Sequence, residues 1–475
     1  MVVGETAEET DVLVVGAGSG GYVAAIRAAQ LGKSVILVNK DELGGVCLHQ
    51  GCIPSKALLH VAELYHQCTL AGDMGITGSV SVDLGKLQAW KRGVVDRLDS
   101  GIRRLCKLNG VEIINGWASF QSSDYARIET GGEAVYVKFK SAIIDTGSKP
   151  VEFPGVSFDE KVILSSKGIL ELEELPKRLV CIGGGFISVE MSIFYAKLGS
   201  KVTILHRGKR LLKGTDPELV ELNQKWMQTL GIVIKLGTSV EKIARASGGA
   251  KIYARGADGK VEELEADAVL IAIGRKPNTE GFGLERTKVQ LDERGFIKVD
   301  ERMRTTDSRI YAIGDVVGEP MLATKAFREG KVAAEVIAGL PSAMDYFAMP
   351  VVIFSDEIAY VGLSEEQAKE RGIDVVVGRF PFSALGRAVT MNKPEGLVKV
   401  VAEKGSQRIL GVHIFGPQAS SLISEATLAI EMGATLEDVA STLHPHPTLP
   451  EAVMEACEEA LGRSVHLFRK GRTSS

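Results

Sequence analysis

A strand, a glycine-rich turn, a helix and a second strand follow one another near the start of this chain. Residues 12–15 are an unbroken apolar run, residues 34–38 form a second strand that is apolar after Ser34, and residues 22–32 between them have the composition of a helix. Strands buried on both faces of a parallel sheet carry such runs. The turn has glycines where a chain must bend tightly and a helix must approach a strand, at Gly16, Gly18 and Gly21. This order predicts a dinucleotide-binding unit.

The same unit occurs a second time. Residues 179–182 lead into a turn with Gly183 and Gly185, followed by an apolar helix and a strand over residues 201–205. Ser188 stands where a third glycine is usual and is small enough to serve. Two such units predict two bound dinucleotides, a tightly held flavin and a nicotinamide nucleotide. The alternative is that the second unit is a decayed repeat kept for structure.

A third signal is the apolar strand of residues 310–313, which ends in Gly314-Asp315 beyond the second unit. A carboxylate there can accept a hydrogen bond from a sugar hydroxyl. The first domain is therefore predicted to be interrupted by the second. We expect an α/β protein with two Rossmann-like dinucleotide-binding domains and a C-terminal α+β domain. The predicted limits are 1–152 and 274–346 for the first domain, 153–273 for the second and 347–475 for the third.

The composition disfavours several classes of function. Of 475 residues, 45% are hydrophobic and 24% are charged, as in ordinary soluble globular proteins. A formal charge of −4 and a pI near 6.2 argue against a nucleic-acid partner. No apolar run is long enough to predict a membrane span, and the acidic N-terminus has no targeting pattern. We expect a cytoplasmic protein, and no motif predicts a metal site.

Two cysteines lie five positions apart, shortly after the first glycine turn. On a regular helix the Cα atoms of Cys47 and Cys52 would be about 8 Å apart, whereas a disulfide needs roughly 4.4–6.8 Å. The pair can bridge only where the backbone is irregular, and Gly51 supplies that freedom. In a reducing cytosol a disulfide is more often reactive than structural. From the spacing alone, a pair of buried free thiols is the alternative.

Together these motifs resemble the flavin-dependent pyridine nucleotide–disulfide oxidoreductases. Segment 44–56, both fingerprints, Gly314-Asp315 and the His-Pro-His-Pro-Thr run in residues 444–451 stand in that family's order, over about residues 11–466. Segments 44–56 and 444–451 are most similar to the dihydrolipoamide dehydrogenase branch. The resemblance implies a homodimer, formed through the C-terminal domain, that contains FAD and uses NAD or NADP. Its implied substrate is dihydrolipoamide, free or on lipoyl domains of a 2-oxoacid dehydrogenase-type complex.

The resemblance also implies roles for single residues. Cys47 would exchange with the substrate dithiol, and Cys52 would lie against the flavin. His446 would take the thiol proton, oriented by Glu451, and this pair would enter from the other subunit. The implied ion pair near the flavin is Lys56 and Glu190. The implied FAD residues are Gly16, Gly18, Gly21, Asn39, Lys56, Thr146, Gly147, Gly314, Asp315, Leu322 and Ala323. The implied nicotinamide nucleotide residues are Gly183, Gly185, Ser188, His206, Arg207, Gly274 and Arg275.

Elementary chemistry agrees with these roles. Thiol–disulfide exchange needs a thiolate, and an unperturbed thiol has a pKa near about 8.5, so a base is needed at neutral pH. An imidazole at His446 is suitable, and a carboxylate at Glu451 can fix its tautomer. The alternative is an ordinary surface histidine in a proline-rich loop. Glu190 falls on an apolar helix where an unpaired carboxylate would be costly, and His444 is interpreted as structural.

Three positions depart from the family pattern at the flavin end of the molecule. Asn39 stands where a carboxylate usually binds the ribose of FAD, and it can still form an uncharged hydrogen bond. Thr324 stands where relatives often have histidine, and Asp145 stands where a small residue is usual. We expect FAD to stay bound, although less tightly because of Asn39.

A fourth departure concerns the nicotinamide nucleotide. NAD sites usually have an acidic residue at about the position of His206, whereas a 2′-phosphate needs an arginine nearby. Arg207, Lys209 and Arg210 follow in the sequence, and no acid accompanies them. This pattern favours NADP. The alternative is that these side chains are ordinary solvated cations.

Other functions stay open from the sequence. An NADPH-dependent disulfide reductase of the glutathione-reductase type would run the same chemistry in reverse. A mercuric reductase is disfavoured because the C-terminal region has only Cys457 rather than a cysteine pair. A non-catalytic scaffold subunit of an acyl-transfer complex would need neither the redox cysteines nor the His–Glu pair. The basic tail, residues 469–472, is interpreted as solvated.

Overall fold

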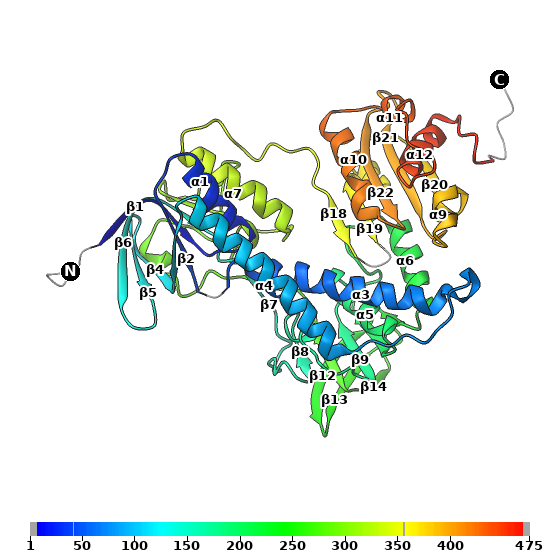
Figure 1. The fold of residues 1–475 in the computed structure, drawn as a ribbon, viewed down its shortest axis with the longest axis horizontal. Helices are drawn as coiled ribbons and strands as arrows, with labels where there is room; N and C mark the ends of the chain where they lie inside the picture. The colour runs from blue at the N-terminus through cyan, green and yellow to red at the C-terminus, as the bar shows by residue number, and fades with distance from the viewer. Residues whose placement is uncertain (1–6, 41, 355–356, 469–475) are drawn as a thin grey trace. The chain divides into compact units, whose positions relative to one another are not determined.

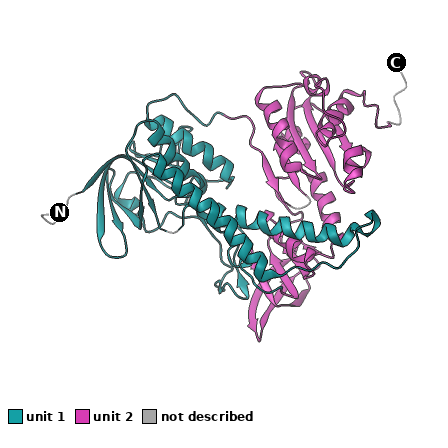
Figure 2. Cartoon of the chain, viewed as in Figure 1, with its two compact units in different colours: residues 1–175, 273–345 teal, residues 176–272, 346–475 magenta. Residues whose placement is uncertain are grey.

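The computed structural model describes residues 7–40, 42–354 and 357–468. It separates the chain into two compact units, coloured in Figure 2. Unit 1 contains the described residues up to Leu175 together with Ile273–Asp345, and unit 2 contains Pro176–Ala272 together with the described residues from Tyr346 onward. Unit 1 is therefore discontinuous in the chain. The limits of the predicted domains stay predictions, and the basic tail lies outside the described residues.

A sheet of seven strands forms the centre of the described part of unit 1 (Figure 1). Its strands are β1 (Glu8–Val15), β2 (Val35–Asn39), β3 (Glu112–Asn115), β4 (Trp117–Ser122), β5 (Tyr125–Glu129), β6 (Ala134–Ile144) and β17 (Ile310–Ala312). They run in the order β3-β2-β1-β6-β5-β4, and β17 pairs with β6. The pairs among β1, β2, β3, β6 and β17 are parallel, whereas β4 and β5 add an antiparallel edge.

The register brings the carboxyl ends of the parallel strands to one edge. Val15 pairs with Val38 of β2 and with Ile144 of β6, and Ile144 pairs with Ala312 of β17. The turns after these strands carry most of the predicted flavin residues. Ligands of open α/β sheets bind at this edge, so the register alone gathers those residues into one place.

Successive side chains of β1 belong to two different cores, because side chains of a strand alternate between the faces of its sheet. Val12 and Val14 pack with residues of α1 (Ser19–Gln30) and α7 (Ala323–Ile337) on one face. Leu13 and Val15 pack with residues of β4 and β5 on the other face. The remaining elements of unit 1 are α2 (Gly45–His49), α3 (Cys52–Leu70), η1 (Ala71–Met74), α4 (Leu84–Leu108), β7 (Ser148–Pro150), β8 (Ile163–Leu164), η2 (Gly168–Leu170), β16 (Arg275–Pro277), η3 (Leu284–Arg286) and η4 (Gly314–Val317).

Unit 2 begins with the second strand–turn–helix–strand unit. Its elements are β9 (Arg178–Ile182), α5 (Phe186–Lys197), β10 (Lys201–His206), α6 (Pro217–Thr229), β11 (Val233–Leu236), β12 (Ser239–Ala246), β13 (Gly249–Arg255), β14 (Val261–Ala266) and β15 (Ala268–Ile271). The order β11-β10-β9-β15 is parallel throughout. Strands β12 to β14 form an antiparallel meander.

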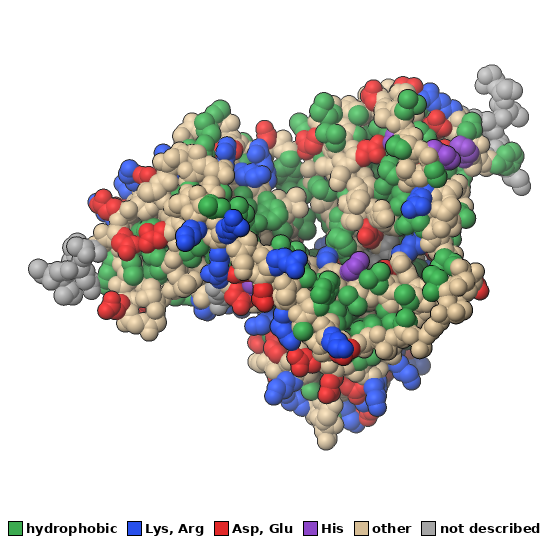
Figure 3. Space-filling view, in the orientation of Figure 1, with side chains coloured by type: hydrophobic (Ala, Val, Ile, Leu, Met, Phe, Trp, Pro, Cys, Tyr) green, Lys and Arg blue, Asp and Glu red, His purple; other side chains and the backbone are tan. Residues whose placement is uncertain are grey.

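Figure 3 shows basic and acidic side chains interspersed over the visible face of the molecule rather than gathered by sign.

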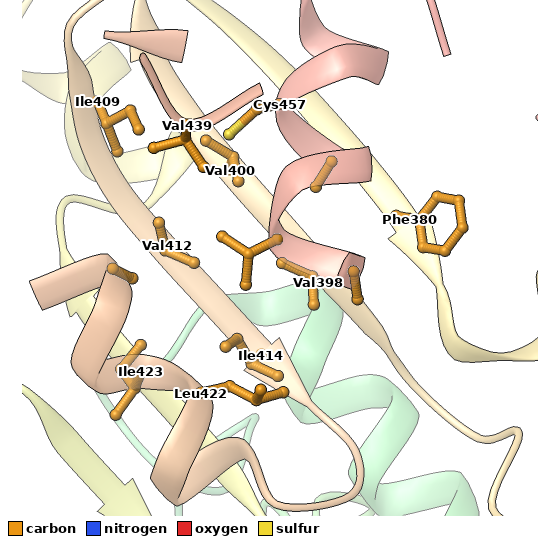
Figure 4. Packing of buried hydrophobic residues seen from close by; sticks show 14 of the residues in the cluster. Phe380, Val398, Val400, Ile409, Val412, Ile414, Leu422, Ile423, Val439 and Cys457 are labelled. Carbon is orange, nitrogen blue, oxygen red and sulfur yellow. The ribbon is translucent and has the colours of Figure 1, made fainter. Parts of the chain in front are cut away.

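The C-terminal part of unit 2 is an antiparallel sheet covered by helices. The strands are β18 (Val351–Ile353), β19 (Ile358–Gly362), β20 (Val375–Pro381), β21 (Leu397–Glu403) and β22 (Ile409–Phe415), in the order β18-β19-β22-β21-β20. The helices are α8 (Glu365–Glu370), η5 (Phe382–Ala384), α9 (Gly386–Thr390), α10 (Ala419–Glu431), α11 (Leu436–Ala440) and α12 (Glu451–Leu461). Figure 4 shows Val398 and Ile414 of the sheet among Leu422 of α10 and Cys457 of α12. The predicted fold class is confirmed.

No helix in the described ranges combines the length and the apolar character needed to cross a bilayer. The longest of the helices above, α4, has an exposed polar face along its length and carries several charged side chains, as its alternation of buried and exposed positions shows. Its buried Lys91 and Gln88 both donate hydrogen bonds to the Leu170 carbonyl, at 2.8 and 3.1 Å. These bonds fix α4 to the segment that leaves unit 1.

Candidate functional site

The predicted redox cysteines lie on either side of a break between two helices. α2 ends at His49, and Cys52 is the first residue of α3. A Cβ on Gly51 would lie 2.9 Å from the Val46 carbonyl oxygen, so this close turn favours glycine. The side chain of Cys52 is hydrogen-bonded to that of Cys47. The backbone is thus irregular where the spacing required it, and both sulfurs come together as predicted.

The redox pair lies directly against the first glycine turn. A Cβ on Gly45, at the start of α2, would lie 2.8 Å from the Cα of Gly18. Ser19, the next residue of the turn, is hydrogen-bonded through its side chain to Cys47. The two motifs that follow one another in the sequence are therefore in contact. A dinucleotide held by the turn would lie beside the sulfurs.

The surroundings of Cys47 favour its ionised form. The hydrogen bond from Cys52 lowers the pKa of Cys47 to about 7 although burial opposes this, and the Ser19 hydrogen bond and the charge of Lys56 lower it further. The thiolate is the nucleophilic form of cysteine. A thiolate at Cys47 near neutral pH suits its predicted exchange with a substrate dithiol.

The first glycine turn fits the pyrophosphate of a dinucleotide. A Cβ on Gly16 would lie 2.2 Å from the Asp145 carbonyl oxygen, and a Cβ on Gly21 would lie 2.0 Å from the Gly16 carbonyl oxygen. Helix α1 starts after Gly18 without a side-chain cap. The positive end of a helix that lacks a cap from its own N-cap residue attracts anions. The turn therefore has the close packing and the helix end that this ligand needs.

Asp315 is held at the same edge of the sheet by a chain of hydrogen bonds. Ser148 Oγ donates to Asp315 Oδ2 at 2.5 Å, and Arg275 Nε donates to Ser148 Oγ at 2.7 Å. Thr146 Oγ1 donates to the Asn278 carbonyl at 2.6 Å. Asp315 thus has a fixed carboxylate, as hydrogen bonding to a ribose would require.

Arg275 and Gly274 belong to unit 1, with the flavin residues. Besides Ser148 Oγ, Arg275 donates through Nη2 to the Ser148 carbonyl at 2.8 Å, and the Gly274 carbonyl accepts from Val151 N at 3.1 Å. Both residues therefore support the edge that carries Asp315. Their implied role at the nicotinamide nucleotide stays a prediction.

The other implied flavin residues end strands or start helices of unit 1. Asn39 is the last residue of β2 and is buried. Gly147 has a φ of +69°, in the left-handed region that favours glycine. Leu322 precedes α7 and Ala323 begins it, without a side-chain cap. These positions lie along or near the carboxyl edge of the sheet, and they fit an extended dinucleotide such as FAD.

The second glycine turn is built from the same kind of elements. Gly183 has a φ of +125°, Gly185 precedes α5, and Ser188 is fully buried within the first turn of that helix. The ring of His206 lies across the turn, because a Cβ on Gly184 would come 2.6 Å from it. Ser188 is thus accommodated where glycine is usual. The predicted second unit is present in full.

Charges beside the second turn are basic. Burial lowers the pKa of His206, and the charge of Arg207 lowers it further, against a hydrogen bond with the Arg210 backbone. Arg207 is exposed and forms no ion pair within the described part of the chain. Arg210, in contrast, lies 3.6 Å from Glu366. Arg207 and Lys209, both exposed and without an ion pair among the described residues, are therefore better placed than Arg210 to meet a 2′-phosphate.

His446 and Glu451 form the predicted base–carboxylate pair in unit 2. His446 Nδ1 lies 2.8 Å from Glu451 Oε1, and Thr448 N donates to Glu451 Oε2 at 2.6 Å. Burial raises the pKa of Glu451, but the Thr448 N–H and His446 outweigh it and the pKa is lowered. The His446 side chain is 79% exposed. Because Nδ1 faces the carboxylate, Nε2 is the nitrogen left to take a proton.

His444 is anchored at both ring nitrogens. Nε2 lies 2.8 Å from Glu425 Oε1, and Nδ1 lies 2.8 Å from the Thr442 carbonyl oxygen. Its side chain is nearly buried. A histidine with both nitrogens engaged cannot serve as a base, so the structural interpretation of His444 fits these contacts.

Glu190 and Lys56 belong to different units. Glu190 is buried on α5, and its Oε1 accepts a hydrogen bond from Phe354 N at 3.0 Å. Lys56 is on α3, where its charge acts on Cys47. The ion pair implied for these two side chains stays a prediction.

Sequence reasoning missed two features of the site. Ser19 was part of the fingerprint, but only the fold brings its hydroxyl to Cys47. Asp145 was noted as a departure without a role, yet it accepts a hydrogen bond from Gly21 N at 2.6 Å. Its position at the end of β6, beside Gly314 and Gly21 in the fold, could not be read from the sequence. No cluster of metal-ligating side chains is present in the described ranges.

Comparison with known proteins places this site in a family. Residues 10–330 match the model of the pyridine nucleotide-disulphide oxidoreductases, and residues 349–457 match the dimerisation domain of the same family. The chain belongs to the pyridine nucleotide-disulphide oxidoreductase family. It is an oxidoreductase of the flavoprotein disulfide class, and the prediction of FAD together with a nicotinamide nucleotide, NAD or NADP, is confirmed.

Among its relatives, the dihydrolipoyl dehydrogenases of Haloferax volcanii and Geobacillus stearothermophilus are each 47% identical over 99% of this chain and 100% of theirs. The predicted resemblance is confirmed. LpdA from Mycobacterium tuberculosis has a TM-score of 0.88 at 24% identity over 94% of this chain and 99% of its own, a likeness of fold. The HOCl-induced flavoprotein disulfide reductase RclA from Escherichia coli has a TM-score of 0.84 at 26% identity, with coverage of 94% and 99%.

Proposed function

We propose that this chain is a dihydrolipoyl dehydrogenase, which oxidises dihydrolipoamide to lipoamide and passes the electron pair to a nicotinamide nucleotide. The observation that carries this function is the Cys47–Cys52 pair, hydrogen-bonded and in contact with the first glycine turn. Full-length identity of 47% to relatives of that name supports the choice of substrate. The His446–Glu451 pair supplies the base that such a substrate needs.

The chemistry on sulfur balances without another reactant. One substrate thiol loses its proton to His446 Nε2 and attacks Sγ of Cys47 in the oxidised pair, so the Cys47–Cys52 bond breaks and Cys52 leaves as a thiolate. The second substrate thiol then attacks the mixed disulfide, which forms the cyclic disulfide of lipoamide and releases Cys47. Two electrons and two protons move from the substrate dithiol to the protein. FAD, when bound, supplies the acceptor that reoxidises the pair and delivers hydride to the nucleotide.

Each protein group has a defined task in this half-reaction. The surroundings of Cys47 keep its pKa at about 7, which makes it a good leaving group when lipoamide is released. Glu451 fixes the His446 ring so that Nε2 is the basic atom, and it stabilises the imidazolium that forms. General bases in such positions contribute about 10²–10⁴-fold in rate.

The protein is proposed to act as a homodimer, since a dimerisation domain spans residues 349–457. The His446–Glu451 pair of one subunit would then serve the cysteines of the other. Its proposed partners are lipoyl domains of a 2-oxoacid dehydrogenase-type complex or free dihydrolipoamide, in the cytoplasm.

A second candidate is an NADPH-dependent disulfide reductase. The observation that favours it is the basic surface beside the second turn, where His206 and exposed Arg207 stand in place of an acid. An acidic residue at this place would bind the 2′-hydroxyl of NAD, and arginine suits the 2′-phosphate of NADP. The two candidates share all the sulfur chemistry. They differ in the nucleotide and in the direction of electron flow.

Anaerobic titration of the purified protein tests the function directly. Dihydrolipoamide should reduce the protein and produce long-wavelength absorbance from a thiolate beside the flavin, which NAD⁺ or NADP⁺ then abolishes. Cys52→Ser should abolish turnover with dihydrolipoamide, and Cys68→Ser, at an exposed position further along α3, should leave it unchanged. Reduction by NADPH but not by dihydrolipoamide would establish the second candidate. Turnover that survived in Cys52→Ser would refute the disulfide mechanism of both.

A further inference from the structure

A buried carboxylate fills the space behind the first glycine turn. Asp145 follows the last residue of β6 and is only 6% exposed. A Cβ on Gly314 would lie 2.5 Å from its Oδ1, and a Cβ on Gly18 would lie 2.7 Å from its Oδ2. A Cβ on Gly20 would lie 3.2 Å from Asp145 Oδ1. Three glycines of the flavin-binding edge thus pack directly on this carboxyl group.

Asp145 occupies the same helix end that a pyrophosphate would use. Gly21 is the third residue of α1, and its N–H donates to Asp145 Oδ2 at 2.6 Å. The helix has no side-chain cap of its own, so this distant carboxyl group replaces one. An ionised carboxylate there would take up the favourable potential of the helix end and repel a second anion held by the same turn.

Carboxyl groups outnumber the ammonium group among the charged side chains that act on Asp145. Asp315 of η4 and both Glu329 and Lys325 of α7 act on Asp145 through their charges. Lys325 Nζ lies 2.9 Å from Glu329 Oε1. Glu329 Oε2 also accepts from Gly314 N at 2.7 Å. The first turn of α1 contributes no charged side chain. Three carboxyl groups therefore face the ammonium group of Lys325, and Arg275, whose charge acts on Asp315, is a further cation of this edge.

These surroundings oppose ionisation of Asp145. Burial raises the pKa of Asp145 well above its usual range, and the negative charges of Asp315 and Glu329 raise it further. The Gly21 N–H and the Lys325 charge act in the opposite direction. The balance of these causes favours the neutral acid over the carboxylate.

We propose that Asp145 is a proton-binding residue of the flavin site, which must be neutral for the pyrophosphate of FAD to bind the adjacent glycine turn. Bound pyrophosphate raises the pKa of Asp145 still further, so binding of FAD is linked to retention of this proton. The affinity for FAD is highest at pH values below the pKa of Asp145 in the flavin-free protein. Above it, the dissociation constant rises by about tenfold per pH unit, until the pKa of the complex is reached. The inference rests on flavin binding by the proposed enzyme.

The test uses the holoenzyme and follows flavin release rather than activity. Wild type, Asp145→Asn and Asp145→Ala are diluted at a series of pH values, and released FAD is measured by its recovered fluorescence. Wild type should lose FAD increasingly as the pH rises, whereas both variants should show a flatter profile and hold FAD more tightly at alkaline pH. Asn keeps an oxygen acceptor for the Gly21 N–H, so this variant remains informative if Ala disturbs the fold.

Asp307→Asn is the matched control. Asp307 is another buried aspartate of unit 1, which accepts from Lys288 N at 3.0 Å away from the glycine turn, and its loss should leave the pH profile of FAD release unchanged. Infrared spectra of the holoenzyme should contain a C=O stretch of a protonated carboxylic acid that disappears in Asp145→Asn. Equal pH profiles in wild type and Asp145→Asn, or an unchanged infrared band, would overturn the inference. Neither result would touch the proposed function, which fails if dihydrolipoamide does not reduce the yellow protein or if turnover survives in Cys52→Ser.

Discussion

The two glycine turns share a backbone plan but differ in what surrounds them. At the first turn, added Cβ atoms on Gly16 and Gly21 would lie 2.2 and 2.0 Å from backbone carbonyl oxygens, and a buried carboxyl group fills the space behind. At the second turn, a Cβ on Gly185 would meet no atom of the described chain within 4 Å, and the three atoms nearest to a Cβ on Gly184 all belong to the His206 side chain. The first turn is therefore packed closely against backbone and a buried carboxyl group, whereas the second is less closely packed at Gly184 and Gly185.

This difference matches what each nucleotide has to do. A flavin that stays bound through every turnover can be held by a rigid turn packed on all sides. A nicotinamide nucleotide must enter and leave, which an open turn with exposed cations at its rim permits. The position of the third fingerprint glycine makes the contrast concrete, because Gly21 of the first unit corresponds to Ser188 of the second.

The largest effect is expected from Gly21→Ala. The new Cβ would lie 2.0 Å from the Gly16 carbonyl oxygen and 3.0 Å from Asp145 Oδ2, so the backbone of the turn must move. Overpacking of this kind costs about 1–3 kcal/mol or more, and it should deplete the purified protein of FAD. Flavin absorbance per polypeptide and the melting temperature measure the effect.

Ser188→Ala is the matched variant in the second turn. Position 188 already carries a side chain, so removal of its hydroxyl should leave the FAD content at the wild-type level and change the melting temperature little. If Gly21→Ala retained full flavin, or if Ser188→Ala lost it, the contrast between a closed and an open turn would be wrong.

A smaller effect is expected from Arg207→Glu at the rim of the second turn. Arg207 is exposed and without an ion pair in the described residues, so it is free to meet a 2′-phosphate. Reversal of its charge should weaken NADPH use by about tenfold or more, equivalent to about 1.4 kcal/mol, and should leave NADH use nearly unchanged. Values of kcat/KM for both nucleotides measure the effect.

Arg210→Glu is the control for Arg207→Glu. Arg210 already lies 3.6 Å from Glu366, so its replacement should weaken NADPH use less. Equal losses with NADH and NADPH in Arg207→Glu would mean that the cations are ordinary surface charge. The nucleotide preference would then be set by other residues of the site.

The sequence predicted the elements of both turns because they depend on local patterns. Apolar runs of the right length, glycines at fixed spacing and the Cys47–Cys52 separation are all visible within a few tens of residues, and the structure has each of them. The environment of Asp145 was not predictable. It depends on the register of β6 and β17 and on the packing of α7 against α1, which place Gly314, Glu329 and Lys325 beside a residue far away in the chain.

The smallest of these effects is expected from Ser19→Ala, which probes how the first turn acts on the redox pair. The Ser19 hydrogen bond helps to hold the pKa of Cys47 at about 7, after the larger contribution of Cys52. Without it the thiolate is less stabilised, so the pKa of Cys47 should rise by up to about one unit. Alkylation of the reduced enzyme should then be slower near neutral pH and reach the wild-type rate in alkali. Thr69→Ala, on the exposed end of α3, should alkylate as wild type does. An unchanged pH profile in Ser19→Ala would mean that the first turn holds the flavin without tuning the sulfurs, and the functional contrast between the two turns would reduce to packing alone.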